Sequence, residues 1–395
     1  MAALTHTFRT NRRYFIISAY LIATLIVVAW LLPIIGAQRP YRLVQSTITG
    51  LLVGGVYSLI ALGIVIINKA SGVFNFAHGW MMLLGGLIFF SFYSAPAISP
   101  LAAIGLPLIT GVMVMTTNSW RSLADTRNLI ILAVGTAVLA IILSLQGDQW
   151  ELIRAITAAA IGGVLIGLTI ERFNIRPLIG QPLFAMVLMT LAVSELLHGI
   201  TQLIWGSVEL PLQVFGGIQQ LGIPAQIRFG ETVFERPINV RADLLLAFLL
   251  ALTAFGVFVA FFRFTNVGLS MRAIAENQKL GQSVGLRVRT ILAIAWAIAA
   301  LLAAVAGVLQ GGATSLSLNL PLLALLAFPA VLLGGLESIP GALIGGLVIG
   351  LAQELSNLLF PGTQVGTELA PYVILMIVLV IRPDGLFGEK RIERI

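Results

Sequence analysis

The sequence predicts an all-α, polytopic integral membrane protein, and three observations point to that fold class. Hydrophobic residues occupy 58% of the 395 positions and charged residues only 10%, against about 25% charged residues in soluble domains. Apolar runs of about 20 residues, the length of a helix that crosses a bilayer, recur along the chain. The short alternating segments typical of a membrane barrel are absent. The runs are therefore expected to be helices, whose backbone hydrogen bonds are satisfied internally.

The hydrophobic segments number twelve, of which about 10–12 are expected to be membrane helices, with short or re-entrant helices among them. Segments 321–336 and 339–358 are separated only by Glu337 and Ser338, so these two are the candidates for short or re-entrant helices. The other ten segments are 14–36, 44–67, 72–94, 97–117, 127–146, 152–170, 183–205, 243–263, 290–310 and 369–382. The first is expected to be a retained anchor, because no small-residue cleavage pattern follows it closely.

Basic residues are unevenly divided between the predicted loops. With a cytoplasmic N-terminus, 17 of the 23 Lys and Arg residues fall on the cytoplasmic side. Basic residues gather on that side of membrane proteins, so both termini are expected in the cytoplasm and the protein in the plasma (inner) membrane. The outward-facing residues are Arg39, Arg42, Arg154, Arg228, Arg236 and Arg241. The net charge of +7 therefore requires no nucleic-acid partner.

Side chains suited to catalysis or metal binding are scarce. The chain has no cysteine, and its three histidines, His6, His78 and His198, are too few and too scattered for a metal site. No nucleophile, base and acid form a recognisable catalytic arrangement. No lysine is preceded by Gly and followed by Ser or Thr, so the chain lacks a phosphate-binding loop. Neither a cofactor on this chain nor an enzymatic activity is expected.

The predicted inner loop 264–289 has an amphipathic pattern. Asn266 is expected to cap a helix whose apolar face includes Met271. Arg272 and Glu276 lie four residues apart, as an ion pair on a helix requires. The pattern alone leaves two interpretations open: a linker that lies on lipid headgroups, or a short helix that docks in a groove of a cytoplasmic partner.

Four blocks of sequence occur in the same order as in one known family. They are Val73-Phe74-Asn75-Phe76-Ala77-His78-Gly79, Glu171-Arg172-Phe173-Asn174-Ile175-Arg176-Pro177-Leu178, Gly268 through Leu286, and Leu332 through Gly346. Through these blocks, residues 44–387 resemble the permeases of branched-chain amino acid importers of the ABC class, a family that includes urea permeases. Each block alone is weak, and their common order carries the resemblance.

The resemblance implies a membrane-spanning permease subunit of an ATP-driven importer for branched-chain or related amino acids, with a urea or amide importer as the alternative. It implies two ATP-binding subunits that bind ATP and Mg, a second homologous or identical permease, an extracytoplasmic solute-binding protein and the lipid bilayer as partners. It also implies that the inner loop contacts the ATPase. The coupling residues would be Gly268, Arg272, Ala273, Ala275, Glu276, Gly285 and Leu286.

The chain departs from the family pattern between about 95 and 150. Two additional apolar segments, 97–117 and 127–146, are expected there as an insertion of two membrane helices. An even number of crossings preserves the topology of everything downstream. The whole chain, 1–395, is otherwise expected to be a single transmembrane permease domain with a coupling loop at 264–289.

Polar residues inside apolar segments are candidates for a substrate pathway or gate, because ionisable groups are costly in a membrane. Glu195 and His198 lie one turn apart and could either line the pathway or pair at a helix interface. Asn75, Phe76 and His78, from the first block, could gate, bind or buttress. Glycines are expected to serve close helix packing. The architectural residues are Gly54, Gly55, Gly334, Gly335, Pro340 and Gly341.

Two other classes of function remain open from the sequence. An ion-driven secondary transporter would work without an ATPase, and the coupling-loop pattern argues against it. An intramembrane enzyme or a membrane scaffold would act with no transport partner present.

Overall fold

Helices dominate the part of the chain that the computed structural model describes, namely residues 39–207, 209–215, 224–231, 233, 236–276, 278–363 and 368–388. In this part seven helices are long and apolar enough to cross a membrane, and four apolar helices are shorter. All eleven correspond to predicted segments, so the all-α, polytopic fold class is confirmed. The twelfth segment, 14–36, lies outside the described residues.

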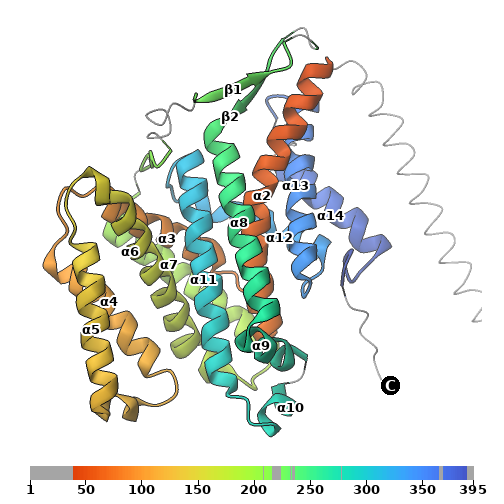
Figure 1. Ribbon diagram of the computed structural model, residues 1–395. Coiled ribbons are helices and arrows are strands. Elements are labelled where there is room, and N and C mark those ends of the chain that lie inside the picture. Colours follow the sequence, from red (N-terminus) through yellow and green to blue (C-terminus); the bar gives the residue numbers. More distant parts are fainter. Residues whose placement is uncertain are drawn as a thin grey trace, which may run out of the picture.

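The long helices form a bundle with the shorter ones packed among them (Figure 1). The long helices are α2 (Pro40–Ser71), α5 (Thr126–Leu143), α6 (Asp148–Thr169), α7 (Leu183–Trp205), α8 (Ala242–Phe264), α11 (Val288–Ala313) and α13 (Ile339–Leu359). The shorter apolar helices are α3 (His78–Tyr93), α4 (Pro100–Met115), α12 (Leu320–Gly334) and α14 (Ala370–Ile381). The remaining elements are η1 (Trp120–Ala124), η2 (Ile170–Ile175), η3 (Arg176–Leu178), β1 (Gln226–Phe229), β2 (Ile238–Arg241), α9 (Asn266–Glu276) and α10 (Gln278–Ser283).

Helix α2 lies at the centre of the bundle and packs most extensively against α13. Glycines allow the two backbones to approach closely, because a Cβ at Gly54 would lie 2.8 Å from Leu347 Cα. A Cβ at Gly350 would likewise lie 2.5 Å from Gly54 Cα. Beside these contacts, the buried Tyr57 hydroxyl donates a hydrogen bond of 2.7 Å to Gln353 Oε1. The centre of the bundle therefore depends on small residues and one internal side-chain hydrogen bond.

A tight turn joins α12 to α13 beside the C-terminal end of α2, where Lys69 donates a hydrogen bond to Glu337 O. The backbones of Gly334 and Gly341 touch across this turn, and Gly335 has a φ of 103°, which favours glycine. Ser338 caps α13 by accepting a hydrogen bond of 3.1 Å from Gly341 N, and Pro340 occupies the first turn. Of the two candidates for short helices, α12 is short, with 15 residues, whereas α13, with 21, is long enough to span.

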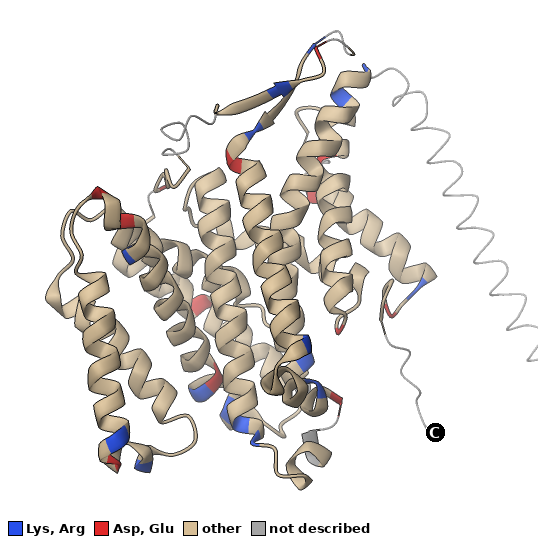
Figure 2. Cartoon of the chain, in the orientation of Figure 1, with Lys and Arg blue, Asp and Glu red and all other residues tan. Residues whose placement is uncertain are grey.

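The two ends of the bundle carry different elements, and charged residues gather at both (Figure 2). At one end β1 and β2 form an antiparallel hairpin, with Gln226 opposite Arg241. Helix α2 is 32 residues long, about 48 Å, so it extends beyond a hydrocarbon core of about 30 Å. Its Gln45 side chain accepts a hydrogen bond of 2.7 Å from Asn239 N of β2. Helices α9 and α10 lie at the opposite end (Figure 1).

The predicted continuous segment 72–94 is only partly helical, which corrects the sequence interpretation. Helix α2 ends at Ser71, where Gly72 has a φ of 69°, and α3 starts only at His78. Residues 72–77 are as apolar as those of a membrane helix, so composition alone does not distinguish a helix from a non-helical segment. Asn75 and Phe76 therefore lie in a non-helical segment before α3.

Helices α4 and α5 form an antiparallel pair, here called the α4–α5 hairpin, at the edge of the molecule (Figure 1). Its contact with the rest of the bundle is mainly through α6. Most of its large apolar side chains are exposed, for example Leu101 and Ile141 at 86% and 65%. Such a surface is suited to a lipid environment and not to water.

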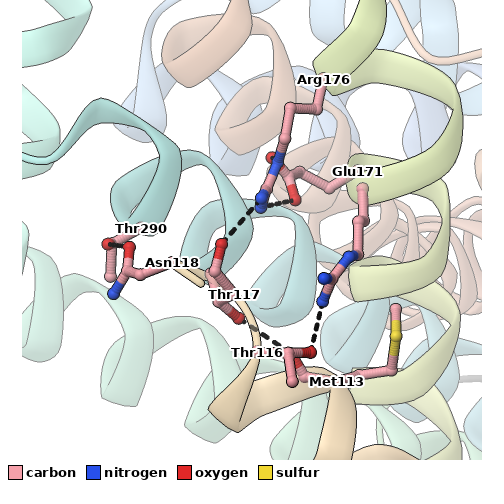
Figure 3. Close-up of polar contacts among 8 residues, drawn as sticks. Met113, Thr116, Thr117, Asn118, Glu171, Arg176 and Thr290 are labelled. Atoms are coloured by element: carbon pink, nitrogen blue, oxygen red, sulfur yellow. Dashed lines mark hydrogen bonds and ion pairs between the residues drawn. The ribbon is translucent and has the colours of Figure 1, made fainter. Parts of the chain in front are cut away.

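The Glu-Arg-x-x-x-Arg-Pro block holds the end of this hairpin at which α4 connects to α5 (Figure 3). Arg176 donates two hydrogen bonds to the buried Glu171 carboxylate, at 2.9 and 2.6 Å, and a third of 2.7 Å to Thr117 O. Arg172 donates to Thr116 Oγ1 at 2.5 Å and lies over the Trp120 ring at 4.4 Å. The two arginines thus bind the residues that follow α4 to the end of α6 and its π-helical extension η2.

A single buried arginine holds the opposite end of the hairpin. Arg154, in the first turns of α6, is only 1% exposed and donates to Phe92 O at 2.6 Å, near the end of α3. It also donates to Ala95 O, which precedes the hairpin, and to Leu145 O, which follows it. The distance to Leu145 O is 3.2 Å. A cation at the C-terminus of a helix is favoured by the helix dipole. Both ends of the α4–α5 hairpin are therefore held by arginines of the α6 segment.

Candidate functional site at the interrupted helices

The segment between α2 and α3 returns into the bundle instead of crossing it. His78 packs against Gly63, where an added Cβ would lie 2.5 Å from His78 Cε1. Gly63 lies about two turns before the end of α2 at Ser71, so residues 72–77 climb back by about 12 Å. Helix α3 therefore starts inside the membrane-spanning part of the bundle.

A second interrupted segment approaches from the opposite end. After α11 ends at Ala313, Leu316 packs back against Gly86 and Gly311. Helix α12 then starts beside the start of α3, because a Cβ at Gly79 would lie 2.5 Å from Pro321 O. The N-terminal ends of two short helices thus meet in the interior. Helix N-termini carry partial positive charge, and transporters use such ends to face anionic groups of their solutes.

Asn75 and His78 are both fully buried at the start of α3. Asn75 is satisfied locally, since its Oδ1 accepts from Ala77 N at 3.1 Å and its Nδ2 approaches Met81 Sδ at 3.2 Å. Neither imidazole nitrogen of His78 has a hydrogen-bond partner among the described residues. A buried polar group without a partner is costly, and functional sites are where such groups are found. The geometry therefore gives Asn75 a supporting position and leaves His78 open to an interaction.

Phenylalanine side chains link the re-entrant segment to α12. Phe74 stacks on Phe328 with ring centroids 4.6 Å apart, and Phe76 lies 5.4 Å from the same ring. Thr190 of α7 holds the backbone of this segment, donating to Phe74 O at 3.2 Å and accepting from Phe76 N at 3.4 Å. Phe76, placed among the candidate pathway residues, therefore belongs to an aromatic cluster at the junction of α3, α7 and α12.

Glu195 and His198 lie together on α7, with His198 Nδ1 3.6 Å from Glu195 Oε2. The His198 ring stacks on Trp80 of α3, with centroids 4.3 Å apart. The Glu195 side chain is 81% exposed, although it stands near the middle of a 23-residue apolar helix. A carboxylate exposed at that depth to lipid would cost about 2.5–3.5 kcal/mol or more. This face of α7 is therefore expected to meet water or another protein surface, not lipid.

The predicted coupling residues lie far from this junction, on and around α9 and α10. Gly268 is buried against the Phe262 backbone, and Gly285 has a φ of 87° after α10. Leu286 packs near Gly281, and Ala275 is half-buried. Ala273 and Glu276 are exposed. The set thus divides into residues that shape the segment and residues that face outward.

Two details of the sequence interpretation of α9 are wrong. Thr265, not Asn266, caps the helix, because its Oγ1 accepts a hydrogen bond of 3.0 Å from Gly268 N. Arg272 donates instead to Phe262 O and lies 5.3 Å from the Phe262 ring centroid, and no ion pair with Glu276 forms among the described contacts. The acceptor for Arg272 is a carbonyl near the end of α8, which the residue pattern of α9 alone does not predict.

Helices α9 and α10, at the end of the bundle opposite the β1–β2 hairpin (Figure 1), carry apolar side chains. Met271 and Ile274 are buried, as the amphipathic pattern predicted. Leu269, Leu280 and Val284 are instead 58%, 63% and 71% exposed. Together with Ala273 and Glu276 they form what we call the inner docking face. Exposed large apolar side chains on a segment that does not span the membrane are typical of a protein-interaction surface.

A polar cavity of about 490 Å³ lies at the β-hairpin end of the bundle, between the start of α8, the end of α11 and residues 211–215. Arg241 in its wall donates to Asp243 Oδ1 and Oδ2, at 3.1 and 2.5 Å. These hydrogen bonds, and the negative charge of Asp243, raise the pKa of Arg241 above its ordinary value. The cavity therefore carries a permanent charge pair on the side away from α9.

Sequence reasoning missed four residues that organise these sites: Trp80, Thr190, Phe328 and Arg154. The signal for Arg154 was present, because a charged residue beside an apolar segment is a candidate by default. The other three become visible only when helices distant in sequence are brought together. No group of three or more His, Cys, Asp or Glu that could hold a metal ion occurs among the residues that were described.

These features define the class: a multi-pass, α-helical membrane protein with two interrupted helices, as in transporters. Residues 128–381 match the family described as branched-chain amino acid transport system / permease component. The chain belongs to this family.

Relatives extend the similarity over nearly the whole chain. The chain is 29% identical over 358 residues to BraD of Pseudomonas aeruginosa, a high-affinity branched-chain amino acid transport system permease protein, covering 90% of this chain and 99% of BraD. It is 26% identical over 359 residues to the LivH permease of the same description in Escherichia coli K12, covering 89% and 97%. A probable branched-chain amino acid transport permease of Methanocaldococcus jannaschii is 29% identical over 244 residues, covering 59% and 74%.

Proposed function

We propose that this chain forms half of the transmembrane pathway of an ATP-driven importer for branched-chain or related amino acids in the plasma membrane. Two separate subunits bind ATP and Mg and supply the energy. A second permease, homologous or identical, completes the pathway, and an extracytoplasmic binding protein delivers the solute. The family match and the similarity to the BraD and LivH permeases support this assignment.

The exposed carboxylate of Glu195 is the observation that carries the proposal. It stands at mid-membrane on α7, 81% exposed, with Trp80 and His198 beside it. A pathway between two permeases would cover this face with water and protein, which removes the cost of exposing a charge to lipid. A single chain acting alone would leave that cost uncompensated.

The junction has groups that complement a zwitterionic, apolar solute. The Glu195 carboxylate suits an α-ammonium group, and the N-terminal ends of α3 and α12 suit a carboxylate. The rings of Phe74, Phe76 and Phe328 would contact an aliphatic side chain. Urea lacks both charges and the apolar side chain, so this arrangement favours amino acids over the urea alternative.

The inner docking face supports coupling to an ATPase. Its exposed apolar residues lie at the end of the bundle opposite the β-hairpin, where both termini and the ATPase are placed by the proposed orientation (Figure 1). A groove on a partner would bury Leu269, Leu280 and Val284 together. The 264–289 segment is therefore assigned to coupling, and 95–150 to an insertion that carries the α4–α5 hairpin.

Uptake measurements test the assignment. Cells that carry the permease with its neighbouring transporter subunits are given labelled leucine or urea, with the ATPase intact or inactivated. We expect leucine uptake that is lost with the ATPase, and no urea uptake. Uptake that persists without ATP hydrolysis would instead indicate an ion-driven secondary transporter.

A charge substitution tests the role of α7. Glu195→Gln keeps the shape of the side chain and removes its charge, so we expect leucine uptake to fall about tenfold at unchanged expression. Glu209→Gln, which also removes an exposed carboxylate but from the outer loop, is the matched control and should transport normally. Normal uptake by Glu195→Gln would remove Glu195 from the pathway.

A further inference from the structure

The α4–α5 hairpin leaves an apolar cavity of about 390 Å³ between itself and α6. Pro107 and Val114 of α4, Gly135 and Leu139 of α5, and Val164 of α6 are among its lining residues. The volume falls in the range of about 300–1,000 Å³ that is usual for small-molecule sites. The cavity is open to the surface of the hairpin, where Val114 is 52% exposed. A membrane-spanning hairpin therefore carries a lateral opening in its apolar belt.

The lining excludes water as the occupant. Two side chains in the lining carry hydroxyl groups, Thr110 and Thr136. Thr110 donates to Leu106 O at 2.8 Å, whereas Thr136 Oγ1 is buried without a partner among the described residues. An ordered water needs about two to four polar partners, and one free hydroxyl does not supply them. The lining is suited instead to a flexible hydrocarbon chain.

Cationic and aromatic residues stand at the inner end of this cavity. Arg121 and Arg127 lie in or beside the connection between α4 and α5, and both are exposed. The structure gives neither guanidinium an ion pair or a hydrogen bond within its described residues. Arg127 precedes the lining residue Ile131 by about one turn. Trp120, 61% exposed, is placed like the aromatic residues that mark a membrane interface.

We propose that the cavity binds one acyl chain of an anionic phospholipid, whose phosphate is held by Arg121 and Arg127. Basic residues at helix ends bind anionic headgroups through charge, and the cavity above them takes the chain. In the proposed orientation, with α9 and α10 at the cytoplasmic side, the lipid lies in the inner leaflet. The site itself does not depend on which solute is transported. The hairpin thereby becomes a lipid-binding unit attached to the permease.

Retention of lipid by the purified, full-length protein tests this proposal. Delipidated protein is titrated with phosphatidylglycerol or phosphatidylcholine, and bound lipids are counted by native mass spectrometry. Gly135→Leu fills the cavity, since a Cβ there meets nothing within 4 Å. Gly105→Leu is the matched control, because it has equally open surroundings on α4 but is not among the lining residues.

We expect wild type and Gly105→Leu to retain phosphatidylglycerol, and Gly135→Leu to bind it about tenfold more weakly. The double variant Arg121→Gln/Arg127→Gln should lose the preference over phosphatidylcholine, whereas Arg228→Gln in the outer hairpin should keep it. Wild-type binding by Gly135→Leu, equal loss in both glycine variants, or equal binding of the two lipids by wild type would each overturn the proposal.

A second measurement is independent of substitutions. Wild-type protein is irradiated with a phosphatidylglycerol that carries a photoreactive group in one acyl chain. Crosslinks in peptides that contain 107–115 or 131–139 are expected, because these peptides supply most of the cavity lining. Crosslinks that spread evenly over the other exposed helices would contradict a defined site.

Discussion

At the residue scale, the single side chain of Arg154 connects three separate segments of the chain. Its guanidinium satisfies carbonyls from the end of α3, from the residues before the α4–α5 hairpin and from the residues after it. Buried carbonyls that lose their donor carry a desolvation cost. One side chain therefore sets the outer geometry of three helices.

We expect Arg154→Ala to lower the free energy of unfolding by about 3 kcal/mol, because it leaves the buried Phe92 carbonyl and the part-buried Ala95 and Leu145 carbonyls without their donor. Thermal unfolding in detergent measures the effect. Arg228→Ala, which removes an exposed arginine from the outer hairpin, should leave the midpoint unchanged. An equal response of both variants would indicate a loss of charge alone and not of these hydrogen bonds.

Gly350 tests the close contact of α2 and α13. A Cβ there would lie 2.5 Å from Gly50 O and from Gly54 Cα, both backbone atoms that cannot move aside independently. Gly350→Val should therefore separate the helices and cost about 1–3 kcal/mol or more, read as reduced folded yield in size-exclusion chromatography. Gly199→Val, on α7 with nothing within 4 Å, should fold normally and is the control.

At the scale of elements, the apolar runs predicted eleven helices because length and composition are local properties. They did not predict the break at 72–77, because the unwound backbone there is held by Thr190, a residue of α7 far along the chain. The same reason explains Arg272, whose partner is a carbonyl of α8 and not Glu276. The spacing along α7 predicted the pairing of Glu195 with His198. It did not predict that Trp80 of α3 stacks on His198.

The inner docking face yields a prediction for α9 and α10 as a unit. Val284→Asp places a charge on this face, where Val284 is 71% exposed, and should reduce co-purification of the ATP-binding subunit about tenfold. Val233→Asp makes the same change at a residue 77% exposed at the outer end and should have no effect. Undiminished co-purification of Val284→Asp would move the docking site elsewhere.

At the scale of the whole molecule, orientation can be measured directly because the chain has no cysteine. A single Glu231→Cys in the outer hairpin connection should react with a membrane-impermeant maleimide added to intact cells. Gln282→Cys, in α10, should react only after the membrane is opened. Both side chains are exposed, so access to the reagent depends on sidedness. The reverse labelling pattern would place the inner docking face outside the cell.

The arginine hydrogen bonds at the two ends of the α4–α5 hairpin predict how the hairpin moves. Because Arg154 of α6 holds one end of the hairpin, and Arg172 and Arg176 of the directly following η2 and η3 hold the other, the hairpin is expected to move with α6 as one body when the bundle changes shape. Spectroscopic labels on α5 and α6 should then keep a constant separation through the transport cycle, while labels on α5 and α7 change theirs. A label on the exposed hairpin would therefore report the position of α6, a helix that packs inside the bundle.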